Sequence, residues 1–281
     1  PEVKRTARSI QRTALSGIRQ EKVFMFNGGG RNGKGLIDEL LMDCVGNYGY
    51  KGNIAVLTKE IKAGANPEVA NLDKMRLVVF NEPNDNELYE TRLRGIILAL
   101  TLLIEVNKRP RINSRIDESI AGRFINIVFE TYFTTDKKEL ETLPNAKPCN
   151  PEYKTHAFRE RFKHALFKYL LDCPDDTIYI CDRVRNDTKE YLMDNDDLLE
   201  WITENYQKTD DPEDYVKLSS MHKDFKETQS SKGRGMTQKS FIQDVSSNLE
   251  MRKYYKQKYQ PTINGKQVCL RNIIVGWKLK D

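Results

Sequence analysis

The sequence has few cysteines and histidines and contains no long apolar run. Five of its 281 residues are Cys and three are His, and no two cysteines form a C-x-x-C pair. Disulfide frameworks and zinc sites need paired, regularly spaced ligands, so we expect reduced thiols and no metal held by protein ligands alone. The longest apolar run, Ile96 to Ile104, includes Thr101 and is far shorter than the roughly 20 residues that span a bilayer. The sequence therefore predicts no membrane span and no membrane partner.

The chain begins with Pro1 rather than Met and has no signal-peptide pattern, so we expect a piece of a longer protein. The cysteine pattern predicts that this protein is intracellular. Apolar residues make up 38% and charged residues 31% of the sequence, enough apolar surface for a sizeable core, so wholesale disorder is excluded. A chain of this length forms one large domain or, more typically, two.

The charges are unevenly distributed along the chain. The net charge is +5, but the stretch from Asp172 to Asp214 contains 15 acids and 4 bases, a local net charge of −11. The stretch from Lys217 to Asp281 contains 14 bases and 5 acids, a local net charge of +9. These two stretches predict two surfaces with different partners, and the basic one is a candidate for a polyanion. A solvated basic face without a partner is the alternative.

Apolar periodicity predicts an α/β core followed by a smaller module. Apolar residues spaced by three and four predict helices over 2–19, 33–45 and 153–171, and β-rich runs predict strands at 21–27, 76–81, 96–106 and 124–129. Strands separated by helical or polar stretches predict a mostly parallel sheet. Another helix begins at Asp196 or Asp197, either of which fits as its N-cap. Helices at 218–228 and 238–249, followed by β-rich stretches around the hairpin signal Asn264-Gly265, predict a winged-helix-like module.

The strongest motif follows the first strand and reads Gly28-Gly29-Gly30-Arg31-Asn32-Gly33-Lys34-Gly35. It satisfies the pattern G-x-x-x-x-G-K of a phosphate-binding loop, in which backbone N–H groups and the N-terminus of the next helix hold an anion. Lys34 is expected on an exposed loop, facing the β- and γ-phosphates of a nucleoside triphosphate. A structural glycine loop without a ligand is the alternative.

The same residues also satisfy the G-x-G-x-x-G pattern of dinucleotide-binding domains. That pattern requires an acid about 20 residues further on, at the end of the second strand, and the stretch Ile54–Lys59 offers none there. The lysine and the missing acid favour a nucleoside triphosphate.

One residue departs from the phosphate-binding pattern. Gly35 stands where the hydroxyl of a Ser or Thr normally binds Mg²⁺. Either the metal is held through water and another side chain, or hydrolysis is weakened.

Three further motifs carry residue types that nucleotide hydrolysis needs. The apolar strand 77–81 ends at Glu82, as in a Walker B element, whose carboxylate polarises the attacking water or contacts Mg²⁺. The strand 97–106 ends at Asn107, an amide of the kind that orients water in ring ATPases, with a turn-initiating Asn as the alternative. Arg123 precedes a strand and either stabilises transition-state charge in trans or forms a structural ion pair.

These four motifs in this order resemble the superfamily 3 helicases, particularly the primase-helicases of poxviruses and other large cytoplasmic DNA viruses. The resemblance covers residues 21 to about 135 through FNGGGRNGKG, NPEVANLDKMRLVVFNEP, IILALTLLIEVNKRPRI and DESIAGRFINIVFE. The stretch VCLRNIIVGWKLK also looks like that family's tail domain. The segment 83–95 is shorter than the family's segment with a DNA-gripping hairpin, so no pore-loop residue is assigned.

The resemblance implies an AAA+-like P-loop ATPase that uses ATP and Mg²⁺. Lys34 would hold phosphate, Glu82 would serve metal and water, Asn107 would be the sensor, and Arg123 would be the finger that reaches the neighbouring subunit. A hexameric ring on single-stranded or forked DNA, a primase portion earlier in the same longer chain, and replication in the host cytoplasm are also implied. The chain then divides into a helical linker or collar (1–20), an ATPase core (21–150), a helical extension (151–207) and a basic winged-helix-like domain (208–281).

Two other functions remain open. A DNA-binding assembly module with a degenerate nucleotide site would fit Gly35 and the short segment after Glu82. An AAA+ remodelling or packaging ATPase would share the same motifs and act on something else.

Five basic residues are the candidates for DNA contacts, on the second helix and the first hairpin strand of the basic module: Lys239, Arg252, Lys253, Lys256 and Lys258. Tyr254, Tyr255 and Tyr259 are interleaved with them, a mixture that suits backbone contacts and base stacking. The alternative is a solvated face and a small core that uses these tyrosines.

Overall fold

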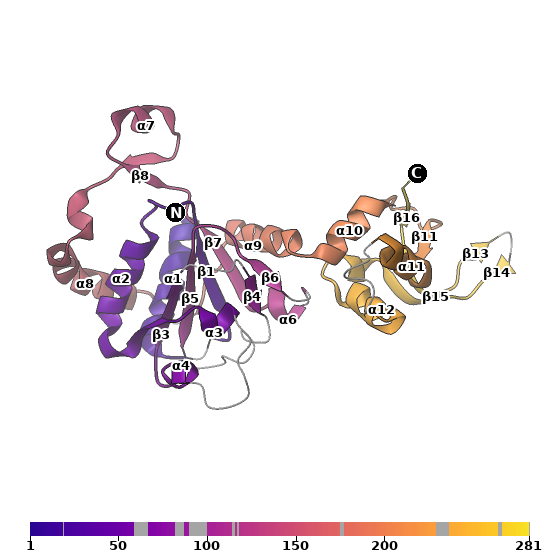
Figure 1. Ribbon diagram of the computed structural model, residues 1–281, viewed down its shortest axis with the longest axis horizontal. Helices are drawn as coiled ribbons and strands as arrows, with labels where there is room; N and C mark the ends of the chain where they lie inside the picture. Colours follow the sequence, from indigo (N-terminus) through magenta and orange to yellow (C-terminus); the bar gives the residue numbers. More distant parts are fainter. Residues whose placement is uncertain are drawn as a thin grey trace. The chain divides into compact units, whose positions relative to one another are not determined.

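The computed structural model describes residues 1–18, 20–58, 67–81, 87–89, 100–113, 116, 118–174, 177–228, 236–263 and 266–280 (Figure 1). The chain forms two compact units, one of Pro1–Ser114 and Gly122–Tyr191 and the other of Arg115–Ala121 and Leu192–Asp281. The four segments inferred from the sequence are a finer division, and their boundaries stay a prediction.

A five-stranded parallel sheet forms the centre of the first unit. Its order is β2 (Gly49–Gly52), β3 (Leu77–Asn81), β5 (Thr101–Val106), β1 (Val23–Asn27) and β7 (Phe124–Val128). The inner strand β1 is buried along its whole length, as expected of an apolar strand in a sheet that is covered on both faces. The mostly parallel sheet predicted from the sequence is confirmed.

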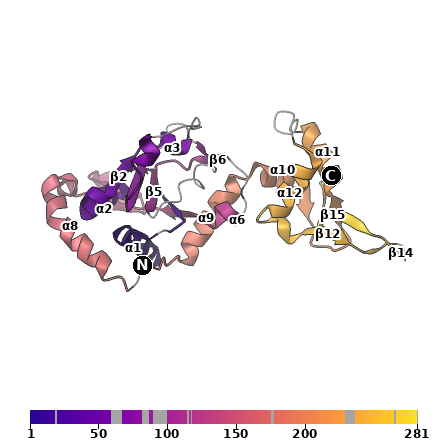
Figure 2. The same ribbon diagram turned by 90° about the horizontal axis from the view of Figure 1, so that it is seen from below.

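Helices α1 (Glu2–Ser16), α2 (Lys34–Val45) and α8 (His156–Leu171) pack together on one face of this sheet. Ile10 of α1 and Leu41 of α2 share a buried cluster with Phe24 and Phe26 of β1. Figure 2 shows α3 (Ala55–Thr58) on the other side of the sheet from α1. The apolar spacing in the sequence thus predicted the helices that cover the sheet.

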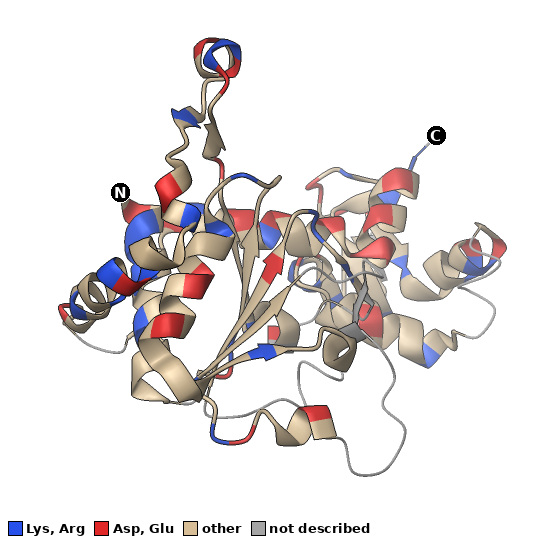
Figure 3. Ribbon diagram, turned by 60° about the vertical axis from the view of Figure 1, so that its left-hand side comes forward, with Lys and Arg blue, Asp and Glu red and all other residues tan. Residues whose placement is uncertain are grey.

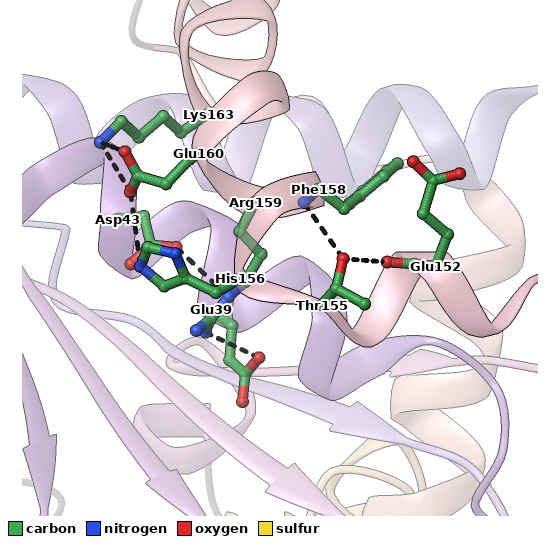
Figure 4. A network of polar contacts seen from close by, with 9 residues as sticks. All are labelled: Glu39, Asp43, Glu152, Thr155, His156, Phe158, Arg159, Glu160 and Lys163. Atoms are coloured by element: carbon green, nitrogen blue, oxygen red, sulfur yellow. Dashed lines mark hydrogen bonds and ion pairs between the residues drawn. The ribbon is translucent and has the colours of Figure 1, made fainter.

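Helix α8 is linked to α2 by a polar network (Figure 4). The guanidinium of Arg159 donates to the Glu39 carboxylate at 2.9 Å and lies 3.7 Å from that of Asp43. The Cys44 thiol donates to the Lys163 carbonyl at 3.1 Å, and burial together with the nearby Asp43 raises the pKa of this thiol to about 11. The network holds α2 against α8, and α2 begins at Lys34 of the glycine-rich motif.

The other elements of the first unit are short, apart from α9. They are η1 (Gly46–Tyr48), α4 (Pro67–Ala70), β4 (Glu87–Tyr89), β6 (Arg111–Asn113), β8 (Tyr132–Thr134), α7 (Lys137–Thr142), β9 (Ala146–Pro148), η2 (Pro151–Lys154) and α9 (Asp182–Asp194). One interpretation is wrong: residues 55–58 form helix α3 and not the end of the second strand, because β2 already ends at Gly52. The residues directly after β2 contain no acid either, so the acid that a dinucleotide site requires at the end of the second strand is missing there too.

The second unit has the predicted winged-helix-like arrangement. Its helices are α6 (Glu118–Ala121), α10 (Asp197–Asn205), α11 (Leu218–Thr228), α12 (Gln238–Ser247) and η3 (Met251–Lys253). Its strands are β10 (Tyr206–Lys208), β11 (Tyr215–Lys217), β12 (Tyr255–Tyr259), β13 (Thr262–Ile263), β14 (Lys266–Gln267), β15 (Leu270–Val275) and β16 (Trp277–Leu279). Strands β11, β15 and β12 form an antiparallel sheet. The hairpin signal Asn264-Gly265 lies outside the described residues, between the paired strands β13 and β14.

The second unit has a core of its own, in which Trp201, Phe225, Phe241 and Trp277 are buried. Of the two predicted caps of α10, Asp196 is the one whose side chain accepts a hydrogen bond from the first turn. Within the described part of the chain, none of the helices combines the length and the apolar character needed to cross a bilayer.

We expect Ile10→Ala to lower the free energy of unfolding by about 2–5 kcal/mol, the usual cost of truncating a large buried aliphatic side chain. Ile10 is fully buried between α1 and the sheet. The matched control is Ile18→Ala, because Ile18 is 50% exposed and such substitutions usually change stability by less than about 0.5 kcal/mol. Urea unfolding followed by far-ultraviolet circular dichroism compares the two, and equal effects would show that α1 is not part of the core.

Candidate nucleotide site

The glycine-rich loop connects the carboxyl end of β1 to the first residue of α2. Gly30 and Gly33 have φ angles of 86° and 84°, in a region that other residues rarely adopt. Gly28 has no room for a side chain, because a Cβ there would lie 2.6 Å from the Phe129 carbonyl oxygen. The course of the loop therefore depends on glycine at these three positions.

Lys34 is buried, with 1% of its surface exposed, which corrects the expectation of a lysine on an exposed loop. Its Nζ donates to the Gly28 carbonyl oxygen at 2.8 Å, to Asn32 Oδ1 at 3.0 Å and to Asn107 Oδ1 at 3.3 Å. An ammonium group has three N–H donors, and these oxygens are enough to use all of them. A phosphate oxygen that binds Lys34 must therefore replace one of these acceptors.

The structure brings Lys34 and Asn107 together at one edge of the sheet. Asn107 directly follows β5, and β5 pairs in parallel with β1, so both strands deliver their carboxyl ends to the loop. Glu82, the predicted Walker B acid, lies outside the described residues. The strand that precedes it ends at Asn81, opposite Glu105 of β5, and thus at the same edge of the sheet.

Arg123 lies at the opposite edge of the sheet. Its carbonyl accepts a hydrogen bond from the Val23 N–H at 2.8 Å, where β1 begins. The length of β1 separates this edge from the glycine loop by about 16 Å, at roughly 3.3 Å per residue. The Nη1 atom of Arg123 is buried and has no hydrogen-bond partner among the described residues. This side chain is too short to reach the loop of its own subunit.

Two carboxyl groups that the sequence motifs do not include lie beside the loop. Asp38, one turn into α2, is 3% exposed, and neither of its carboxyl oxygens has a hydrogen-bond donor among the described residues. Its carboxyl neighbour is Glu105 on β5; burial first, and then this neighbour, raise the pKa of Asp38 well above its usual value. Glu105 also faces Gly35, where a Cβ would lie 3.7 and 3.8 Å from its two carboxyl oxygens. The signal in the sequence was an acid inside an apolar strand.

The chemistry of these groups fits a magnesium ion bound together with a nucleotide. The described residues include no cluster of three or more His, Cys, Asp or Glu side chains able to hold a metal by themselves. Mg²⁺ prefers oxygen ligands and is commonly bound through one or two carboxylates plus substrate phosphates. Glu105 offers such a carboxylate next to the loop.

An apolar cavity of about 670 Å³ lies beside the loop. Helix α2 and the segment 129–154 supply the apolar side chains that line it, including Leu36, Ile37, Phe129, Phe133 and Tyr153. The Phe133 N–H donates to the Arg31 carbonyl at 2.6 Å, which ties β8 to the loop. The volume and the lining are typical of a small-molecule pocket. No sequence motif marks the segment 129–154, so this cavity could not be predicted from the sequence.

All five predicted DNA-contacting residues are exposed in the second unit, and three of them lie on the predicted elements, Lys239 on α12 and Lys256 and Lys258 on β12. Lys258 lies directly opposite Arg271 of β15, which is also exposed. Like charges that face each other across two strands destabilise the pair, and an anion would relieve this repulsion. Arg271 is not among the residues predicted from the sequence, because its position opposite Lys258 follows from the strand register.

The other two predicted residues differ from the expectation. Arg252 and Lys253 lie on η3 and not on the hairpin strand. Arg252 is ion-paired with Glu118, and Lys253 with Glu250 at 2.6 Å. These partners offset part of their positive charge, so both contribute less to the attraction of a polyanion.

The interleaved tyrosines make contacts within the second unit. The ring of Tyr254 packs against Trp277 with centroids 5.7 Å apart, and the Tyr255 hydroxyl donates to Asn272 Oδ1 at 2.8 Å. The Tyr259 hydroxyl donates to the Pro212 carbonyl at 3.0 Å. These contacts favour the alternative, a small core that uses the tyrosines, over base stacking.

No protein-family model matches the sequence. Over 188 residues the chain is 24% identical to the protein named primase D5 of fowlpox virus (strain NVSL), a match that covers 58% of this chain and 24% of the relative. The chain thus spans about a quarter of that relative's length. An apo structure of the C-terminal region of NrS-1 has a TM-score of 0.50 at 15% identity and covers 96% of this chain and 71% of that one, which shows a shared fold. The predicted resemblance to a poxvirus primase is confirmed as distant homology.

We expect Lys34→Ala to abolish ATP binding and hydrolysis, because the loop would lose the ammonium group that faces phosphate. The buried position of Lys34 means that the loop also loses three hydrogen bonds, so circular dichroism must show that the fold persists. The control is Lys22→Ala, a lysine at the opposite edge of the sheet that donates to the Gly122 carbonyl at 2.5 Å. Steady-state hydrolysis is the measurement, and unchanged turnover in Lys34→Ala would disprove a phosphate-binding loop.

Proposed function

We propose that this chain, a distant homologue of a poxvirus primase, is the ATP-driven DNA helicase motor of a viral replication primase-helicase. The observation that carries the proposal is the hydrogen bond from Lys34 of the glycine loop to Asn107, at the carboxyl edge of a parallel sheet. This edge is where open α/β sheets bind their ligands. A lysine for phosphate and an amide for water are two of the groups that phosphoryl transfer uses.

The loop offers several groups for phosphate. The N-terminus of α2 adds partial positive charge, and Lys34 supplies a full charge once a phosphate oxygen replaces one of its present acceptors. Asn107 is 3.3 Å from Lys34 Nζ and thus close enough to the γ-phosphate to orient an attacking water. The apolar cavity beside α2 has room for the nucleoside. Mg²⁺ bound with ATP would offset charge on the phosphates, and Glu82 is the residue that the family resemblance assigns to it.

The position of Arg123 supports an assembly of several subunits. Arg123 cannot serve the loop of its own chain, since it lies about 16 Å away at the far end of β1. A second subunit could supply its Arg123 to the loop, as arginine fingers do in trans. Contacts that run from one edge of a subunit to the other edge of the next form a ring when the rotation between subunits closes. We take this ring to be hexameric and to translocate on single-stranded or forked DNA, as the resemblance implies.

The second unit supports a contact with the DNA backbone. Lys239, Lys256, Lys258 and Arg271 are exposed, and none of them belongs to the buried core. Contacts to phosphate hold a protein on DNA without reading its sequence, which suits a motor that must move along many sequences. The primase activity is assigned to a portion of the longer chain outside these residues.

One specific observation favours a second function. Gly35 removes the usual hydroxyl ligand of Mg²⁺, so the chain could be a DNA-binding assembly module that binds a nucleotide without hydrolysing it. DNA-stimulated ATP hydrolysis distinguishes the motor from this module. Strand displacement distinguishes it from an AAA+ remodelling or packaging ATPase.

We expect Arg123→Ala to lower the rate of ATP hydrolysis by about 10³–10⁵-fold in assembled rings while nucleotide binding persists. The control is Arg183→Ala, an exposed arginine paired with Glu130. Mutant and wild-type chains are then mixed at several ratios. Activity should fall more steeply than the fraction of mutant chains, because each mutant subunit disables a neighbour's site. A strictly proportional fall would argue against a shared site.

Lys256→Glu/Lys258→Glu should weaken the binding of the full chain to a single-stranded oligonucleotide. Each lost phosphate contact lowers the salt slope by about 1, so we expect a slope smaller by about 2. The same charge change on α7, Lys137→Glu/Lys138→Glu, is the control and should leave binding unchanged. Fluorescence anisotropy over a series of salt concentrations measures both. Equal slopes for the two variants would remove β12 from the DNA-binding surface.

A further inference from the structure

Glu105 is an unusual residue for its position in the fold. The strands of the parallel sheet are nearly free of charge (Figure 3), and Glu105 and Lys51 are the two charged residues within them. Glu105 lies on the same face of β5 as Leu103, which packs against α2 in the buried cluster. A carboxylate that points toward such a cluster costs solvation free energy unless another group compensates for it.

Glu105 stands next to the position where the loop lacks its usual metal-binding group. The missing Ser or Thr hydroxyl would be attached to a Cβ on Gly35, and that Cβ would lie 3.7 and 3.8 Å from the two Glu105 oxygens. These are ordinary van der Waals distances. A carboxylate is therefore already present beside the place from which the hydroxyl would extend.

Asp38 gives an independent indication of a cation at this place. It lies three residues after Gly35 and four after Lys34, so all three are on one face of α2. The residue is 3% exposed, both of its carboxyl oxygens are buried, and no donor among the described residues reaches either of them. Two adjoining carboxyl groups at a buried site repel each other when both are ionised, and a cation relieves this repulsion.

We propose that Glu105 supplies the carboxylate oxygen that faces the nucleotide-bound divalent cation, in place of the hydroxyl that Gly35 lacks. This inference rests on the proposed nucleotide site. Carboxylate oxygens are ligands that Mg²⁺ prefers, and Glu105 of β5 is two residues before Asn107, which directly follows this strand. Asp38 contacts Glu105 and is a positioning residue that lies behind the ligand.

The test measures metal affinity directly, with Mn²⁺ as the probe. The full chain is saturated with a non-hydrolysable ATP analogue and titrated with Mn²⁺, and free Mn²⁺ is measured by electron paramagnetic resonance. Glu105→Gln should weaken Mn²⁺ binding by about 10- to 100-fold, the range found when groups that support a metal site are removed. The affinity for the analogue in the presence of EDTA should not change, because the lysine and the loop are intact.

A second variant keeps the test independent of any folding defect in Glu105→Gln. Gly35→Ser restores the missing hydroxyl, and its Cβ fits without a close contact. Added to Glu105→Gln, it should recover most of the lost Mn²⁺ affinity. The matched control is Glu39→Gln, the neighbour of Asp38 on α2, which pairs with Arg159 and should bind Mn²⁺ as the wild type does.

Three results would overturn the assignment of Glu105. These are wild-type Mn²⁺ affinity in Glu105→Gln, no recovery on adding Gly35→Ser, and a larger loss in Asp38→Asn than in Glu105→Gln. Failure of the proposed function looks different, because the wild-type chain would then not bind the analogue even in EDTA. If the analogue binds and Glu105→Gln has the same Mn²⁺ affinity as the wild type, the assignment of Glu105 is rejected and the proposed function is not.

Discussion

The glycine loop depends on the solvation of one buried ammonium group. A charged group removed from water must find hydrogen-bond acceptors. Lys34 finds them at the first residue of the loop, Gly28, further along the loop at Asn32, and after β5 at Asn107. These oxygens converge because β1 and β5 are adjacent and parallel and end together. The burial of Lys34 therefore depends on the strand order, which brings these acceptors together, and on the glycine conformations, which set the course of the loop.

The same parallel sheet separates two chemical functions by the length of a strand. The loop lies at the carboxyl edge and Arg123 at the amino edge. A single chain cannot bring them together, whereas a head-to-tail contact between identical chains can. The strand length that keeps Arg123 from its own loop thus makes nucleotide hydrolysis, on the proposed function, a property of the assembly and not of the subunit.

Local sequence patterns predicted most of the fold. Contacts between residues that are distant in the sequence and are brought together by the sheet could not be predicted. Helices α1 and α2 are marked by apolar spacing and strands β1 and β3 by apolar runs. Both are local patterns, and all four elements lie where the sequence indicated. Lys34 was placed on the correct loop but expected in solvent, because its burial depends on Asn107, which is far along the chain. The cavity wall at 129–154 and the pairing of Lys258 with Arg271 are also set by tertiary contacts or register.

The loss of a hydroxyl at Gly35 does not by itself remove a metal ligand from the site. A ligand is defined by its position in space, and β5 holds the Glu105 carboxylate oxygens 3.7 and 3.8 Å from the place of a Cβ on Gly35. A buried strand holds a side chain more rigidly than a loop does, so a ligand on β5 would be well fixed. It would also place the cation close to Asn107, which directly follows β5 and which the proposed function assigns to the attacking water. A movement of β5 would then shift both groups together, which couples metal binding to the orientation of the attacking water.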